Sequence, residues 1–302
     1  KPMKKIKQAF SVAGYNFRQW HRNPRVVITF VLAFILCFLL SNKVVLFARR
    51  YGTTTQLLEP FIWTFGDSDS ILLASLLLVF LFSDMPFLSS GTPFYLMRTS
   101  RSVWLIGQAI YIVGATSLYL LFVMLSTAFV CMENSFIGNL WSPTAVMLGF
   151  SDAGKAIAVP AAQKAMEMVT PYECAANILL LMLLYSLLMA FIMLLFHLWK
   201  GQLAGMVSVF GFSLFGFLLS PDTIKTMLKL SEQEGYVANI IVGWVSPLNH
   251  ATFHMHNFGY DNLPRMGDTL VIFALLIALC FGISLKLVRS YSFIFTGTEG
   301  NT

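Results

Sequence analysis

Three histidines stand close together in the last third of the chain, and histidine is the side chain whose charge changes near neutral pH. They are His250, His254 and His256, in the stretch SPLNHATFHMHNFGYDN. His250 and His254 are four residues apart, so on a helix both would face the same way, as zinc ligands can. His256 would not join them on a regular helix, and a zinc site needs at least three protein ligands. The spacing favours polar residues of a short surface helix over a metal site.

A second stretch matches a nucleotide-binding loop only in part. Residues 149–155 fit the first seven positions of the P-loop pattern, but the eighth is Ala156, which cannot ligate Mg²⁺ as Ser or Thr does. No β-strand pattern precedes the stretch, and that context is what identifies such a loop. We therefore expect no nucleotide site, no resident cofactor and no catalytic residue on this chain.

The four cysteines divide into two pairs. Cys37 and Cys280 lie within apolar stretches and are expected to pack as small apolar side chains. Cys131 and Cys174 bracket one long connection, where a disulfide would need their Cα atoms within about 7 Å. Spacing does not decide this, so the bonded and the free form both stay open.

The elements that must hold these residues are membrane spans. The chain is 57% hydrophobic and 11% charged, with a mean hydropathy of +0.73, whereas a soluble domain carries about 25% charged residues. Six apolar stretches are each about long enough to cross a ~30 Å hydrocarbon layer as a helix. They cover residues 26–47, 71–89, 103–130, 174–198, 203–219 and 269–287. We expect an all-α membrane protein, one domain over residues 1–302, with a re-entrant piece around 136–150 left open.

The charges sort by side when the N-terminus is placed in the cytoplasm. The inner segments then carry 12 of the 20 Lys and Arg residues, seven of them before residue 26, and only two of the 14 acids. Basic residues on the cytoplasmic flanks set the orientation of membrane proteins. We expect a multi-pass protein of the bacterial cell membrane with both termini in the cytoplasm. No basic patch interleaved with aromatic residues indicates a nucleic-acid partner.

Residues 3–22 read as an amphipathic helix lying in the inner interface. Apolar residues at spacings of three and four share one face, and basic residues complement it near anionic lipid. The apolar set is Ile6, Ala9, Ala13, Phe17 and Trp20, and the basic set is Lys4, Lys5, Lys7 and Arg18. The helix anchors the chain to lipid or docks a partner. Gly201 and Gly205 form a small-xxx-small pair that would let two helices approach closely.

The connection between the second and third stretches has the composition of an interface. Thr92 is a candidate N-cap and Pro93 suits the first helical position, so a short helix would run to about Ser100. It would present aromatic and arginine side chains typical of protein interfaces, or it would be an interfacial turn with snorkelling arginines. These side chains are Phe94, Tyr95 and Arg98, with Arg101 following.

The spans themselves contain almost no ionisable residue, although ion-coupled transporters place acids, His or Arg at mid-membrane. This argues against a transporter that supplies its own energy. It suggests that any energy arrives from a partner protein. The serines within the spans more often bond back to their own helix than line a pore.

The order of these parts resembles the ABC-2 type permeases, the membrane subunits of ATP-binding cassette exporters. The resemblance lies in the basic helix 3–22, the six stretches and an outer Ser246-Pro247 with His250, followed by Asn257-Phe258 at a longer spacing than the family has. It also lies in the inner connection, where the chain reads Arg98-Thr-Ser-Arg101 followed by Trp104 and Gly107. The long connection 131–173 departs from the family, in which it is usually short.

The resemblance implies a function and two docking surfaces. Separate ATPase chains would bind ATP and Mg²⁺ and contact the N-terminal helix and the inner connection. The contact residues would be Phe17, Arg18, Pro93, Phe94, Tyr95, Arg98 and Arg101. A second permease chain, identical or not, would complete the path, and the aromatic-rich spans suit export of an apolar or amphipathic drug, peptide or lipid. The alternatives are a membrane-embedded metal-dependent enzyme using the outer histidines and a non-transporting immunity or sensor protein.

Overall fold

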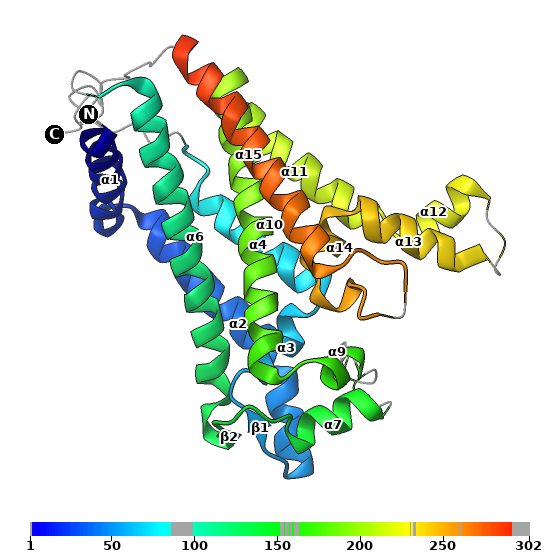
Figure 1. Ribbon diagram of the computed structural model, residues 1–302. Helices are drawn as coiled ribbons and strands as arrows, with labels where there is room; N and C mark the ends of the chain where they lie inside the picture. The colour runs from blue at the N-terminus through cyan, green and yellow to red at the C-terminus, as the bar shows by residue number, and fades with distance from the viewer. Residues whose placement is uncertain are drawn as a thin grey trace.

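The computed structural model describes residues 2–85, 99–151, 154, 157, 159, 163–229, 231, 234–259 and 261–291. This part of the chain is mostly helical, and Figure 1 shows its long helices running side by side in one bundle. The long helices are α2 (Pro24–Tyr51), α6 (Arg101–Cys131), α10 (Pro171–Lys200), α11 (Gln202–Leu218) and α15 (Met266–Ser290), with α1 (Pro2–Arg18) beside them.

Shorter elements connect the long helices. They are the 3-10 helices η1 (Trp20–Arg22), η2 (Met132–Asn134) and η4 (Phe253–Met255), the strands β1 (Thr55–Gln56) and β2 (Ser135–Phe136), and the helices α3 (Glu59–Phe65), α4 (Ser68–Leu81), α7 (Pro143–Phe150), α9 (Gln163–Met168), α12 (Pro221–Leu228), α13 (Gly235–Val245) and α14 (Pro247–Ala251). β1 and β2 pair in parallel, with Thr55 opposite Ser135. We call the end of the bundle that holds these strands the strand end, and the opposite end, beside α1, the α1 end (Figure 1).

Many of the helices begin at the same local signal. A small polar residue occupies the N-cap and proline the first helical position, because proline lacks an N–H that would go unpaired there. The pairs are Asn23-Pro24, Ser142-Pro143, Thr170-Pro171, Ser220-Pro221 and Ser246-Pro247. In four of the five pairs the cap side chain also accepts a hydrogen bond from a backbone N–H of the first turn.

Four helices are long and apolar enough to cross a membrane alone: α2, α6, α10 and α15. α4 has 14 residues and α11 has 17, so they rise only about 21 and 25 Å at 1.5 Å per residue. Each is joined to a shorter helix at a sharp bend. The bend is 91° between α3 and α4, and 77° between α11 and the following α12. The described residues therefore hold four candidate spans, or six if each bent pair counts as one.

The second apolar stretch differs most from the sequence prediction. The stretch 71–89 was expected to be one span, but the helix there runs from Ser68 to Leu81. Residues 86–89 lie outside the described part of the chain. On the other side α4 is preceded, across the 91° bend, by α3, which the sequence did not separate from a loop.

The connection 131–173 holds no spanning helix in its described residues. β2 pairs with β1 at its start, and α7 is only eight residues long, about 12 Å. Figure 1 shows β2 and α7 at the same end of the bundle, with α9 beside α7. The piece around 136–150 is thus a cap over the strand end, and α6 and α10 run in opposite directions on either side of it.

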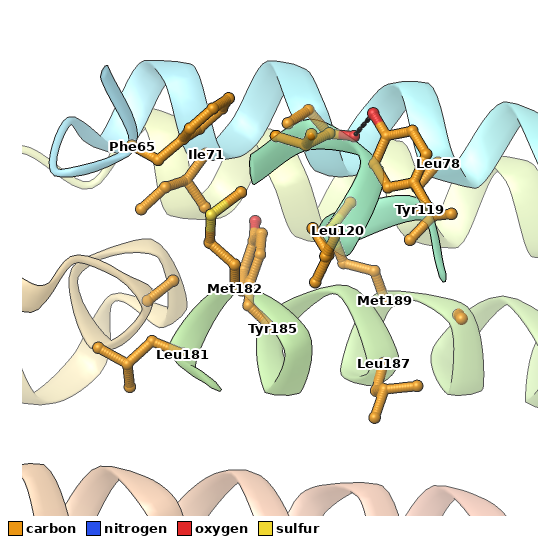
Figure 2. Close-up of a cluster of buried hydrophobic side chains, with 14 of the residues drawn as sticks. Phe65, Ile71, Leu78, Tyr119, Leu120, Leu181, Met182, Tyr185, Leu187 and Met189 are labelled. Atoms are coloured by element: carbon orange, nitrogen blue, oxygen red, sulfur yellow. Dashed lines mark hydrogen bonds between the residues drawn. The ribbon is translucent and has the colours of Figure 1, made fainter. Parts of the chain in front are cut away.

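The core of the bundle lies around α10. The apolar window of α10 is 67% buried, against 17% for α15 and 33% for α2. Figure 2 shows its side chains Met182, Tyr185 and Met189 facing those of α4 and α6, which include Ile71, Leu78 and Tyr119.

Two polar contacts fix the register of the core helices. The hydroxyl of Tyr119 donates to the carbonyl of Ala74 at 2.9 Å, the dashed contact in Figure 2. The hydroxyls of Ser75 and Ser186 lie 3.1 Å apart.

α1 packs along the first half of α6, and its predicted position in the membrane interface stays a prediction. Ala9 and Ala13 of the predicted apolar face are buried, while Ile6 is 57% exposed. The backbone of α1 comes so close to Gly107 that a Cβ there would lie 2.8 Å from the carbonyl oxygen of Ala9. Asn16 donates to the side-chain oxygen of Gln108 at 2.9 Å. Much of the apolar face thus contacts the chain itself.

The predicted close approach at Gly205 is present in the structure. Gly201 ends α10 with φ +91°, a conformation that glycine adopts readily, and α11 turns back along α10. A Cβ on Gly205 would lie 1.8 Å from the ring of His197, so only glycine fits against that ring. The tight turn therefore places α10 and α11 in direct contact.

Candidate functional site

The Ser-Pro pair that precedes the histidines builds the short helix that holds the first of them. Ser246 caps α14, and Pro247 occupies its first helical position. The ring of His250, which is 3% exposed, lies between the end of α13 and the start of α15. Its Nε2 is 3.0 Å from the carbonyl oxygen of Trp244, and its Nδ1 is 2.7 Å from the hydroxyl of Thr269.

The same hydroxyl also contacts the third histidine. Nε2 of His256 lies 3.0 Å from Oγ1 of Thr269, and Nδ1 lies 3.0 Å from the carbonyl oxygen of Thr252. Two rings that are six residues apart in the chain therefore meet at one oxygen atom of α15.

The number of hydrogens available limits what this arrangement can do. A ring nitrogen that faces a carbonyl must carry a hydrogen, so in each neutral ring the nitrogen facing Thr269 is an acceptor. One hydroxyl donates to only one of them, and the second contact becomes a hydrogen bond when one ring takes up a proton. Burial opposes that proton, because it lowers the pKa of His250 and His256 below the usual value for histidine.

His254 points away from the other two rings. It packs against Trp63, with ring centroids 6.4 Å apart, and against Gly66, where a Cβ would lie 2.2 Å from Nε2. Neither of its ring nitrogens has a hydrogen-bond partner. Burial, together with the nearby His256, lowers the pKa of His254 to about 4, so the ring is neutral at pH 7.

The three histidines consequently do not converge on one point. Within the described ranges, no group of three or more His, Cys, Asp or Glu side chains is placed to hold a metal ion. His250 and His254, which a continuous helix would have put on one face, are separated because α14 ends at Ala251 and a different 3-10 turn follows.

A cavity of about 790 Å³ lies beside His254, and we call it the α13 cavity. Its apolar lining comes from α11, α13, α14 and the segment 261–263: Phe217, Leu219, Ile240, Val242, Leu248 and Leu263. Its charged lining comes from the start of α4, from α9 and from the same segment, namely Asp69, Lys164 and Asp261. Ligand pockets in proteins have volumes of about 300–1,000 Å³ and are mostly apolar with a few polar groups.

Hydrogen bonds hold the segment that closes this cavity. The indole N–H of Trp244 donates to the carbonyl of Asn262 at 3.0 Å, and the backbone N–H of Asn257 donates to the carbonyl of Pro264 at 3.1 Å. Lys164 pairs with Oδ2 of Asp261 at 2.7 Å. The pairing joins α9 to the segment 261–263, two parts of the chain 97 residues apart.

The predicted ATPase-contact residues fall into two groups. Pro93, Phe94, Tyr95 and Arg98 lie outside the described residues. Phe17, Arg18 and Arg101 are described and lie at the α1 end. Phe17 packs edge-on against Tyr111, with ring centroids 4.9 Å apart, whereas Arg18 is exposed. Arg101 donates to the carbonyls of Arg289 and Tyr291 at 2.7 and 3.0 Å, so it ties α6 to the end of α15.

A second cavity, of about 560 Å³, opens at the α1 end between η1, the end of α4 and the start of α11. Arg25 and Asp84 form an ion pair of 3.0 Å on its wall, and the side-chain amide of Gln202 donates to the carbonyl of Ser83 at 2.7 Å. These contacts link α2, α4 and α11 at their ends. No local sequence pattern indicates these contacts, because the paired residues are 59 and 119 positions apart.

The disulfide between Cys131 and Cys174 is not formed. All four cysteines are free thiols, and three of them are buried. Sγ of Cys131 lies 2.7 Å from the hydroxyl of Thr55, beside the strand pair. Cys131 ends α6 and Cys174 lies in the first turn of α10, and the β2–α7 connection separates the two helix ends.

Glu59 is a polar residue whose role the sequence analysis missed. It is fully buried at the strand end. Its carboxylate accepts hydrogen bonds from the backbone N–H of Ser142 at 2.7 Å and of Gln56 at 3.2 Å, and from the hydroxyl of Ser142. No local signal marks it, since Ser142 is 83 positions away. The carboxylate fastens the start of α3 to the start of α7.

Comparison of the chain with models of protein families, with curated proteins and with solved structures finds no significant match.

Proposed function

We propose that this chain is the membrane subunit of an ATP-driven exporter of the ABC-2 type. It works with a separate ATPase chain that binds ATP and Mg²⁺ and with a second permease chain. In this proposal the bent pairs α3–α4 and α11–α12 each count as one span, which makes six. The chain crosses the bacterial cell membrane with both termini in the cytoplasm, and its cargo is apolar or amphipathic.

The observation that carries the proposal is the lack of buried charge in the bundle. Among the Asp, Glu, Lys and Arg residues that the structure describes, only Glu59 is buried, and it is bound by backbone N–H groups at the strand end. Transporters driven by ions or protons keep such groups inside the membrane along the pathway. Glu59 is at the first residue of the α3–α4 span and not along its middle, so we infer that the energy for transport comes from a partner.

Two surface features fit the partners. α11 and α15 present large apolar side chains outward, such as Val207, Phe210 and Leu275, which suit lipid or a second permease chain. α1 presents Lys4, Lys7 and Arg18 on the side turned away from α6. A basic, exposed surface of this kind fits an ATPase that docks at the α1 end.

The test is co-purification with transport. The full chain, tagged and co-expressed with an ATP-binding cassette ATPase from a neighbouring gene, should retain that ATPase through detergent extraction. Arg98→Glu should reduce retention and ATP-dependent transport about tenfold or more, because charge reversal replaces attraction by repulsion. Arg101→Glu should do the same, although it also removes the contacts to the end of α15.

Arg50→Glu at the end of α2 is the matched control, since Arg50 is exposed near the strand end. It should leave both readouts unchanged. Retention and transport that survive Arg98→Glu and Arg101→Glu would show that the docking assignment is wrong.

A further inference from the structure

The α13 cavity has an acidic, hydrogen-bond-accepting end and an apolar wall. Two carboxylates, Asp69 and Asp261, face one ammonium group, that of Lys164, so the charged lining carries one net negative charge. Just beyond the cavity, the opposite charges of Asp67 and Lys43 offset each other, so they do not change this balance. The electrostatic balance therefore favours a cation over an anion.

The cavity lining also holds unpaired hydrogen-bond acceptors. Oδ2 of Asp261 is paired with Lys164, but Oδ1 is buried and has no hydrogen-bond partner. His254 lines the same cavity, and both of its ring nitrogens are also without a partner. A neutral imidazole accepts at one nitrogen and donates at the other. Buried polar atoms are normally paired, so Oδ1 of Asp261 and the acceptor nitrogen of His254 favour a ligand that brings N–H donors.

The apolar wall of the cavity indicates that the rest of the ligand is apolar. Phe217, Leu248 and Leu263 come from three different elements and face the cavity together. Gly243 allows the segment 261–263 to approach α13 closely, because a Cβ there would lie 2.5 Å from Leu263. A volume of about 790 Å³ leaves room for more than a headgroup.

We propose that the α13 cavity binds an amphipathic primary amine in its ammonium form. The N–H donors meet Asp261, Asp69 and His254, and the apolar body lies against α11, α13 and α14. As a step in export this role rests on the proposed function. Binding itself needs neither ATPase nor second permease.

Binding is measured on the full chain in phosphatidylcholine nanodiscs with dansylcadaverine, a fluorescent amphipathic primary amine. Phosphatidylcholine has no N–H donor, so the lipid does not imitate the ligand. We expect a saturable rise in fluorescence, and at least a tenfold weaker response to the N-acetylated probe, which has no charge. Equal binding of the two probes, or no saturable binding, would overturn the proposal.

Variants separate this site from the rest of the surface. Asp69 is exposed, so the fold should tolerate Asp69→Asn. This variant should weaken probe binding about tenfold, which is about 1.4 kcal/mol, and Asp261→Asn should weaken it at least as much. Lys164→Met should strengthen binding, because it removes the positive charge beside Asp261. Asp222→Asn on α12 is the matched control, since its side chain is 92% exposed and does not line the cavity. Asp69→Asn and Asp261→Asn that both bind as the unmodified chain does would refute the site.

A last arm distinguishes two sources of the amine. Added phosphatidylethanolamine that competes with the probe identifies an aminolipid as an occupant. Lack of competition, with displacement by dodecylamine, identifies a soluble amphipathic amine. Either result upholds the ammonium chemistry, whereas displacement by neither rejects it. Because no ATPase is present, loss of probe binding leaves the exporter proposal intact, and failure to retain an ATPase leaves the cavity assignment intact.

Discussion

Single polar residues join segments of this protein that are far apart in the chain. Thr269 holds His250 and His256 on α15, and Ser246 caps the helix that carries His250. Glu59 has the largest such role, because two backbone N–H groups and one hydroxyl depend on its carboxylate. Buried donors that lose their acceptor keep the full cost of desolvation.

We expect Glu59→Ala to destabilise the protein by about 2 kcal/mol, because the buried N–H groups of Ser142 and Gln56 lose their shared carboxyl acceptor. Glu59→Gln retains one acceptor oxygen, so its stability should lie between that of the unmodified chain and that of Glu59→Ala. Thermal unfolding in detergent, followed by intrinsic fluorescence, measures the difference. The control is Glu133→Ala, which removes an exposed pair with Arg49 and should cost less than about 1 kcal/mol. Equal unfolding temperatures for the two alanine variants would contradict the role of Glu59.

At the level of elements, the position where a helix starts depends on adjacent residues, whereas the place of the helix in the bundle depends on residues far apart in the chain. α1 shows the difference most clearly. Its basic, amphipathic pattern is typical of helices in the membrane interface. Its small residues Ala9 and Ala13 nevertheless face Gly107 and its neighbours on α6, and small residues on both sides allow close packing. The helix is thereby joined to a long helix of the bundle.

Gly107→Ala should loosen this contact. The added methyl would lie 2.7 Å from Cβ of Val12 and 2.8 Å from the carbonyl oxygen of Ala9, and overpacking of this kind costs about 1–3 kcal/mol. We expect a lower unfolding temperature and faster tryptic cleavage at Lys4, Lys5 and Lys7. Gly282→Ala in α15 adds the same methyl where nothing lies within 4 Å, so it should change neither readout. Cleavage of α1 that does not change in Gly107→Ala would show that the contact is not required.

The whole molecule is a bundle with a buried centre and an apolar exterior. α10 is surrounded by α4, α6, α11 and α15, whereas α2 and α11 expose most of their large apolar side chains and α15 exposes several of its own. Figure 1 also shows α12 and α13 projecting from one side of the bundle. A soluble protein would not leave such surfaces in water, so the exterior suits lipid and protein partners.

The proposed orientation predicts which residues a membrane-impermeant thiol reagent reaches in intact bacterial cells. Asp222→Cys on α12 should be labelled directly, and Lys4→Cys on α1 only after the membrane is permeabilised. Both side chains are exposed, so accessibility differs only through the side of the membrane. The unmodified chain, whose cysteines are buried or half-buried, gives the background. The opposite labelling pattern would invert the topology and remove the α1 end as a cytoplasmic docking surface.

The sequence by itself determined the membrane class and the approximate positions of the long apolar helices. These properties depend on the length of each hydrophobic stretch, which is local in the chain. Only the tertiary structure decided that α4 and α11 are bent away from their continuations, that His254 parts from His250 and His256, and that Cys131 and Cys174 stay apart. It also placed α1 on α6 and gathered the lining of the α13 cavity. The physical reason is that these features rest on contacts between residues far apart in the chain, such as the 97 positions between Lys164 and Asp261, which no local pattern encodes.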